Sequence, residues 1–155
     1  MKQALYERLI QYILENQERF YRMAYSYTKH QEDALDIVQS AVCKALEAYE
    51  NIKNEDAIKT WFYRILINEC LTVLKKRNRV VLIADAMEHE EAYYEKGYEQ
   101  GGDIEQELEK LEIDVQGIIK LRFFEEMSLK EISSITGFNL NTVKTKLYRG
   151  LKLLK

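Results

Sequence analysis

Apolar residues recur every three or four positions along most of the chain, which is the spacing of an amphipathic helix. The clearest stretch is 31–50, where polar residues take the side of the expected helix opposite to the apolar ones. Its predicted apolar positions are Ala34, Leu35, Val38, Ala41, Val42, Ala45, Leu46 and Tyr49. The same spacing predicts helices over 3–14, 20–27 and 57–78, with a break or cap at Asn16.

The pattern changes at residue 80. The stretch 80–103 begins with four apolar residues, becomes rich in Glu and Tyr, and ends near Gly101 and Gly102, so it predicts a linker. Helical spacing then returns and predicts shorter helices over 104–111, 115–125, 129–136 and 141–154. We therefore expect a helical domain over 1–79, a linker over 80–103 and a second helical domain over 104–155.

Composition narrows the fold class. The 155 residues include no proline and only six glycines, all at or after Gly97. Sandwiches and barrels need turns rich in these residues every few positions, so we expect an all-α protein of two small helical domains. No stretch is apolar enough to span a bilayer, and the two cysteines fit a reducing cytoplasm, so we expect a cytoplasmic protein without membrane insertion.

Charge is unevenly distributed, although the net charge is only −3. Residues 1–79 hold 13 Lys and Arg against 11 Asp and Glu, and residues 113–155 hold 8 against 4. The intervening stretch 80–112 holds 2 against 11, so an acidic segment separates two weakly basic lobes. Because salt screens charges over roughly 8–10 Å, a local basic face can bind nucleic acid despite the overall sign.

Nothing in the sequence indicates an enzyme. There is no phosphate-binding loop, no nucleophile–base pair and no metal cluster. The cysteines Cys43 and Cys70, with His30 and His89, lack metal-ligand spacing. We therefore expect no catalytic residues, no metal and no cofactor.

The last 28 residues have the pattern of a helix-turn-helix. Ser128 and Glu131 form a capping box, Gly137 suits a left-handed stop, and Asn141 or Thr142 can cap the next helix. At about 100° per residue, the core side of that helix takes Val143, Leu147, Leu151 and Leu154. The opposite side takes Thr145, Tyr148, Arg149 and Lys152, with Lys144 and Lys146 at the borders. The alternative is an ordinary lysine-rich surface helix, but the two caps and the glycine turn favour DNA binding.

The helix over 57–79 combines aromatic and basic residues. Trp61, Phe62 and Tyr63 are consecutive and cannot all face one core, and six cations accompany a single acid, Glu69. Proteins that bind single-stranded DNA combine a basic track with aromatic stacking platforms. The alternative is that the aromatic residues pack in the core while the cations complement the helix dipole.

Two groups of segments stand out along the chain. The first consists of EDALDIVQ at 32–39 and WFYRILIN at 61–68, and the second of LRFF at 121–124, LKEI at 129–132 and NTVKTKLYR at 141–149. Both groups resemble the extracytoplasmic-function (ECF) group of the sigma-70 family, the promoter-specificity subunits of bacterial RNA polymerase. The first is similar to the family's region 2 and the second to its region 4. Together they cover nearly the whole chain in the family's order.

The resemblance implies an alternative sigma factor that directs promoter-specific initiation in complex with core RNA polymerase. Asp36 and Gln39 would face the β′ clamp helices, and region 4 would also meet the β flap. The −10 element would be read and melted by Trp61, Arg64, Asn68, Lys75, Lys76, Arg77 and Arg79. The −35 element would be read by Asn141, Thr142, Lys144, Thr145, Lys146, Tyr148 and Arg149.

Members of this group respond to stress and are commonly held inactive by an anti-sigma factor, often one anchored in a membrane. The chain departs from the family pattern at Leu111-Glu112, where Leu-Pro is usual, and at Gly150, where alanine is common. A stand-alone dimeric helix-turn-helix regulator is the alternative function. It would explain residues 113–155 but leave 32–39 and 61–68 without a role.

Overall fold

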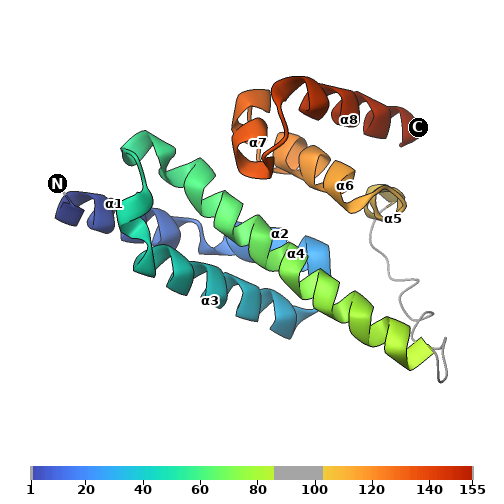
Figure 1. Ribbon diagram of the computed structural model, residues 1–155, viewed down its shortest axis with the longest axis horizontal. Helices are drawn as coiled ribbons and strands as arrows, with labels where there is room; N and C mark the ends of the chain where they lie inside the picture. Colours follow the sequence, from blue (N-terminus) through green and yellow to red (C-terminus); the bar gives the residue numbers. More distant parts are fainter. Residues whose placement is uncertain (1, 86–102, 155) are drawn as a thin grey trace. The chain divides into compact units, whose positions relative to one another are not determined.

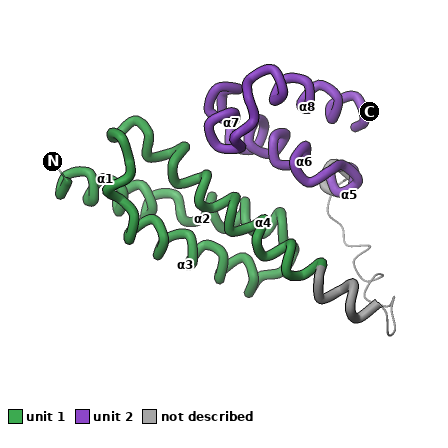
Figure 2. Tube along the Cα trace, in the orientation of Figure 1, with its two compact units in different colours: residues 1–83 green, residues 84–155 purple. Residues whose placement is uncertain are grey.

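The computed structural model describes residues 2–85 and 103–154, and within them the side chains of 2–78 and 106–154. In these two segments every regular element is helical, as the apolar spacing predicted. The chain divides into two compact units, residues 1–83 and 84–155 (Figure 2). Most of the expected linker, 86–102, lies outside the described residues.

Unit 1 is a bundle of four helices joined by short turns (Figure 1). These helices are α1 (Lys2–Glu15), α2 (Gln17–Thr28), α3 (Gln31–Glu47) and α4 (Ile58–Asp85), with two single 3₁₀ turns, η1 (Tyr49–Asn51) and η2 (Glu55–Ala57), before α4. The predicted break at Asn16 is present, although its side chain donates to the carbonyl of Tyr12 and does not cap α2. The helix expected to end near residue 78 continues to Asp85.

Aromatic rings hold the core of unit 1 together. Phe20 on α2 packs against Phe62 and Tyr63 on α4, with ring centroids 4.5 and 5.6 Å apart. All three side chains are almost fully buried. Burying each such side chain stabilises the fold by roughly 1.5–3 kcal/mol. Two of the three consecutive aromatic residues therefore belong to the core, which leaves Trp61 half-buried at its edge.

The apolar face of α3 differs from the predicted one at two positions. Ile37 is 1% exposed and packs with Ala34, Ala41 and Ala45, whereas Leu35 is 47% exposed. The four buried positions repeat every three or four residues, and Leu35 lies one residue away from this stripe. The predicted face was displaced toward Leu35 and missed Ile37, because apolar identity alone does not say which border positions reach the core.

Unit 2 begins with α5 (Asp103–Glu109) and α6 (Ile113–Ile119), which continues as one π-helical turn, η4 (Lys120–Phe124). Of the next two helices, α8 (Leu140–Leu153) packs against α6, and α7 (Leu129–Thr136) contacts α8 and η4 (Figure 1). The predicted capping box of Ser128 and Glu131 is present, and Gly137 ends α7 in the left-handed region at φ 88°. Unit 2 is therefore a helix-turn-helix supported by the buried residues 115–121 of α6 and η4.

The two cysteines differ in burial. Cys70 is fully buried and behaves as a small apolar residue, whereas Cys43 is exposed on the outer side of α3.

No helix within the described segments is both long and apolar enough to cross a bilayer.

Candidate nucleic-acid interface

The outer face of α4 brings three of the predicted −10 residues together. Trp61, Arg64 and Asn68 are separated by three and four residues, so they lie on one side of the helix. Arg64 and Asn68 are exposed and Trp61 is half-buried beside them. The buried Phe62 and Tyr63 anchor the opposite side in the core. Unit 1 thus presents an aromatic ring, a guanidinium and an amide from a rigid helix.

Lys75 extends this face, because it lies seven residues after Asn68 and is exposed. Lys76 is also exposed, at the border of the face. We call Trp61, Arg64, Asn68, Lys75 and Lys76 the α4 face. The side chain of Arg79 lies outside the described residues.

Arg77 does not belong to the α4 face. It lies two residues past Lys75, about 200° around the helix, and turns toward the bundle. Its guanidinium donates to the carbonyl of Thr28 at 3.1 Å from both terminal nitrogens and to Asp33 at 2.8 Å. Sequence reasoning grouped it with its cationic neighbours. The structure gives it an internal structural contact instead.

The predicted polymerase-facing residues lie together on α3. Asp36 and Gln39 are three residues apart and exposed, as the amphipathic pattern predicted. The exposed Leu35 adjoins them. This part of α3 therefore offers a carboxylate, an amide and an apolar side chain in adjacent positions.

Helix α8 begins at a different cap from the predicted ones. Asn139, and not Asn141 or Thr142, is the N-cap, and its side-chain oxygen accepts from the backbone N–H of Thr142 at 2.9 Å. The earlier cap leaves the side chain of Asn141 exposed and that of Thr142 half-buried. Both residues therefore lie in the first turn of α8, where backbone N–H groups point out of the helix and favour anions.

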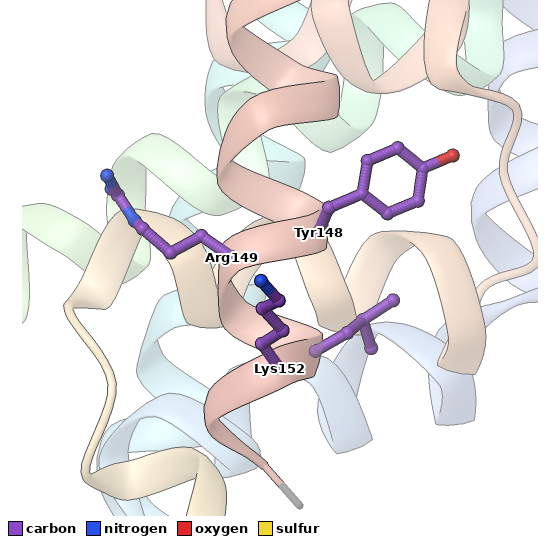
Figure 3. Close-up of a pocket in the computed structure, with 4 residues that line it drawn as sticks. Tyr148, Arg149 and Lys152 are labelled. Atoms are coloured by element: carbon purple, nitrogen blue, oxygen red, sulfur yellow. The ribbon is translucent and has the colours of Figure 1, made fainter.

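The two sides of α8 follow the helical projection, although Leu151 and Leu154, predicted for the core side, are only half-buried. Val143, Leu147 and Gly150 are buried, while Tyr148, Arg149 and Lys152 are exposed. Figure 3 shows these three side chains projecting from the helix, with Tyr148 and Arg149 on opposite sides and Lys152 one turn below. They line a shallow, open depression with Leu151. We call Asn141, Lys144, Thr145, Tyr148, Arg149 and Lys152 the α8 face, since all are exposed.

Lys146 is turned away from the α8 face. Its ammonium group lies 2.9 Å from a carboxylate oxygen of Asp114 on α6, and its side chain is 20% exposed. The same group lies 5.1 Å from the centroid of the Phe138 ring, in the turn before α8. The sequence placed this lysine at the border of the face, and tertiary contacts draw it inward.

The described residues hold no group of three or more His, Cys, Asp or Glu side chains suited to a metal ion. What unit 1 and unit 2 offer instead are two exposed helical faces bearing cations, amides, hydroxyls and aromatic rings. Such groups bind phosphates through charge and base edges through hydrogen bonds. Each of the two faces is therefore a candidate nucleic-acid interface.

Comparison with known proteins assigns both units. Residues 12–80 match the model of Sigma-70 region 2, and residues 102–154 match the model of Sigma-70 region 4. The RNA polymerase sigma factor SigV of Bacillus subtilis is 40% identical over 154 residues, which covers 99% of this chain and 93% of that protein. The ECF RNA polymerase sigma factor SigW of the same organism is 27% identical, covering 89% of this chain and 82% of that protein.

Two solved structures are similar to this chain. One is the sigma factor RpoE in complex with the anti-sigma factor NepR from Bartonella quintana, with a TM-score of 0.76 and 26% identity over 93% of this chain and 92% of that one. The other is CnrH in complex with the cytosolic domain of CnrY, with a TM-score of 0.66 and 18% identity over 94% and 84% of the chains. The second likeness concerns the fold alone.

Proposed function

The chain belongs to the sigma-70 family, in its ECF group, and from that premise we propose how its parts direct transcription. It is an alternative sigma factor, a non-enzymatic subunit that binds core RNA polymerase and promoter DNA. Unit 1 has the role of region 2 and acts on the −10 element. Unit 2 has the role of region 4 and grips the −35 element.

The observation that carries this assignment is the pair of exposed faces, one on each family segment. The α4 face places Trp61 beside Arg64 and Asn68. Separating DNA strands exposes bases, and a base taken from the stack costs a few kcal/mol, which stacking on an aromatic ring and hydrogen bonds to an amide offset. We propose that Trp61 and Asn68 receive unpaired −10 bases, while Arg64, Lys75 and Lys76 hold the phosphates of that strand.

The α8 face suits duplex DNA. Its first turn and its cations meet phosphates, and Arg149 has the planar, forked group that binds the edge of guanine in the major groove. Lys144 is a point charge and positions the helix more than it selects a base. We propose that Arg149 and Thr145 read −35 bases and that Asn141, Lys144, Tyr148 and Lys152 orient α8 on the backbone.

Asp36 and Gln39 supply the contact with the β′ clamp helices in this proposal, and unit 2 meets the β flap. Two weak DNA-binding units on one chain bind a promoter tightly only when a larger body fixes their separation. Core polymerase is that body. The free chain is therefore expected to bind promoter duplex weakly at physiological salt.

Reconstitution with core polymerase tests the function. The purified chain should co-elute with core enzyme on gel filtration and direct run-off transcription from a subset of a promoter library. Asp36→Lys should weaken co-elution, while Glu47→Lys on the same helix serves as a charge-matched control. Tight, specific duplex binding by the free chain, without association with core, would instead identify the stand-alone regulator.

We also propose control by an anti-sigma factor in the cytoplasm. The support is the similar fold of RpoE, which was solved bound to the anti-sigma factor NepR. Exposed apolar side chains suited to such a partner include Leu14 and Leu35 on unit 1 and Phe123 and Phe124 on unit 2. A true inhibitor should displace the chain from core polymerase at equimolar amounts and stop run-off transcription. Inhibition with the polymerase complex intact would contradict this mode of control.

A further inference from the structure

Lys146 joins three separate parts of the helix-turn-helix. Its ammonium group pairs with Asp114 on α6 at 2.9 Å and lies over the ring of Phe138 at 5.1 Å. Phe138 belongs to the turn between α7 and α8, and Lys146 itself lies in the second turn of α8. One side chain therefore contacts the supporting helix, the turn and the recognition helix together.

Asp114 is well placed to act as the fixed end of this contact. It lies in the first turn of α6, where the helix dipole favours a negative charge. The next residue, Val115, is buried, and the Gln116 amide donates to the carbonyl of Leu111 at 2.9 Å. The start of α6 is thus held in place, so a bond to Asp114 transmits that position to α8.

The other contacts between α6 and α8 carry little directional information. Val143 and Leu147 are buried and apolar, and Gly150 lets α8 approach Val115 and Ile119 of α6 closely. Apolar burial is non-directional, so it permits α8 to rotate or slide slightly while remaining docked. A hydrogen-bonded ion pair fixes both distance and angle.

We infer that Asp114 is a positioning residue for −35 recognition, acting through Lys146, and that Lys146 itself does not contact DNA phosphate. This inference rests on the proposed function of unit 2. The pair sets the rotation of α8 about its axis, which decides whether Thr145 and Arg149 point at the base edges. The charge of Lys146 is neutralised within the protein and is not offered to the duplex.

A charge swap separates positioning from direct contact. Holoenzyme is assembled from core polymerase and the full chain carrying Asp114→Lys, Lys146→Asp, or both changes together. The readout is the ratio of binding to a promoter with an intact −35 element over one with a scrambled element. Each single change should lower this ratio at least threefold, in the range of coupling between contacting residues. The double variant should recover most of it, because the pair forms again with reversed polarity.

Lys144 provides the matched control, since it is an exposed lysine on the same helix. Lys144→Asp should lower promoter binding, and combining it with Asp114→Lys should not restore it. If Lys146 faces a phosphate, the double variant places a carboxylate against the DNA. Binding by that variant would then be as poor as by Lys146→Asp alone, and the inference is overturned.

Thermal unfolding of each variant detects loss of folding. Milder substitutions keep the test decisive if a charge-reversed chain does not fold. Lys146→Gln and Asp114→Asn should leave the slope of log affinity against log salt unchanged, whereas Lys144→Gln should reduce its magnitude by about 0.9, the value for one phosphate contact. A reduced slope for Lys146→Gln refutes the inference. If the unmodified holoenzyme ignores the −35 element, the proposed function of unit 2 fails instead, which is a different result.

Discussion

The Arg77 guanidinium lies 2.8 Å from the Asp33 carboxylate, which ties the later part of α4 to the first turn of α3. Both side chains are about one-third exposed, so the pair is neither a free surface bridge nor a fully buried one. The same guanidinium donates to the carbonyl of Thr28, a residue only 3% exposed at the end of α2. One arginine thus connects three helices of unit 1.

Replacing Arg77 should destabilise unit 1 without weakening phosphate binding. Arg77→Gln removes the donors of the Thr28 carbonyl and the partner of Asp33. A buried acceptor left without its partner costs about 1–3 kcal/mol, so we expect the free energy of unfolding to fall by about 1–2 kcal/mol. Urea unfolding measures this. Lys76→Gln is the control, since it should leave stability nearly unchanged but reduce the salt dependence of promoter binding by holoenzyme.

Some of the differences between neighbouring cations can be predicted from the sequence and others cannot. Helical geometry alone separates Arg77 from Lys75, because two residues correspond to about 200°. A closer use of the helical projection would have found this. The internal role of Lys146 was beyond that method, because its partner Asp114 is 32 positions earlier and on another helix. Periodicity reports which side of a helix is apolar, but it does not report which border cations find a tertiary partner.

Gly150 is required by the packing of α8 on α6. A Cβ added at this position would lie 2.5 Å from Cγ1 of Val115 and 3.0 Å from Cδ1 of Ile119. Gly150→Ala should therefore lower the free energy of unfolding of unit 2 by about 1–3 kcal/mol, as overpacking does in other cores. The β-branched Val115 occupies the space that an alanine methyl group would need at position 150.

The double variant Gly150→Ala/Val115→Ala provides the control for that prediction. Removing the Val115 methyl groups gives room for the new Cβ. The double variant should therefore lose less unfolding free energy than the sum of the losses in the two single variants. Thermal unfolding followed by circular dichroism measures the coupling. Simple additivity would mean that the clash relaxes elsewhere and that Gly150 is not required for this contact.

The N-terminus of α8 depends on Asn139 and not on Asn141. The Asn139 side chain accepts the Thr142 N–H at 2.9 Å, whereas the Asn141 side chain is exposed. Asn139→Ala should cost about 1 kcal/mol of stability, and Asn141→Ala should cost little but weaken −35 binding. Urea unfolding and promoter binding of both variants check the pair. Equal loss of stability in the two would contradict the assigned cap.

The cap illustrates a second limit of the sequence. Asn139, Asn141 and Thr142 are all residue types that cap helices well, so composition could not choose among them. The choice depends on the length of the turn between Gly137, whose backbone is left-handed, and the first residue of α8. The capping box of Ser128 and Glu131 was predictable because two residues at a fixed spacing must agree, which a lone asparagine does not require.

Tyr27 makes unit 1 sensitive to alkali. Burial raises the pKa of its phenol well above the ordinary value, and the neighbouring Cys70 adds to the rise. A free phenol ionises near pH 10, so above that pH the unfolded chain loses a proton that the folded chain keeps. The free energy of unfolding therefore keeps its full value below about pH 10 and falls as pH rises further. One such group lowers it by about 1.4 kcal/mol at pH 11.

Urea unfolding at pH 9 and pH 11 tests the role of Tyr27. Tyr27→Phe removes the ionisable group, so it should reduce the loss of unfolding free energy between these two values. Tyr148→Phe is the control, because it removes a phenol that is 59% exposed and lies outside unit 1. A pH dependence unchanged by Tyr27→Phe would show that other groups govern alkaline unfolding.

Asn68 and Arg149 should affect different promoter elements. In run-off transcription by holoenzyme on a promoter library, Asn68→Ala should blunt preference among −10 sequences, because the amide that binds an unpaired base is lost. Arg149→Ala should relax preference at the −35 element by about 1–3 kcal/mol per affected base pair, the value of a forked contact with guanine. Asn51→Ala in η1 and Arg22→Ala on α2 are matched controls, both exposed and outside the two faces. If each variant lowers transcription equally on every template, Asn68 and Arg149 contribute only phosphate binding or folding, and sequence is read by other residues of the two faces.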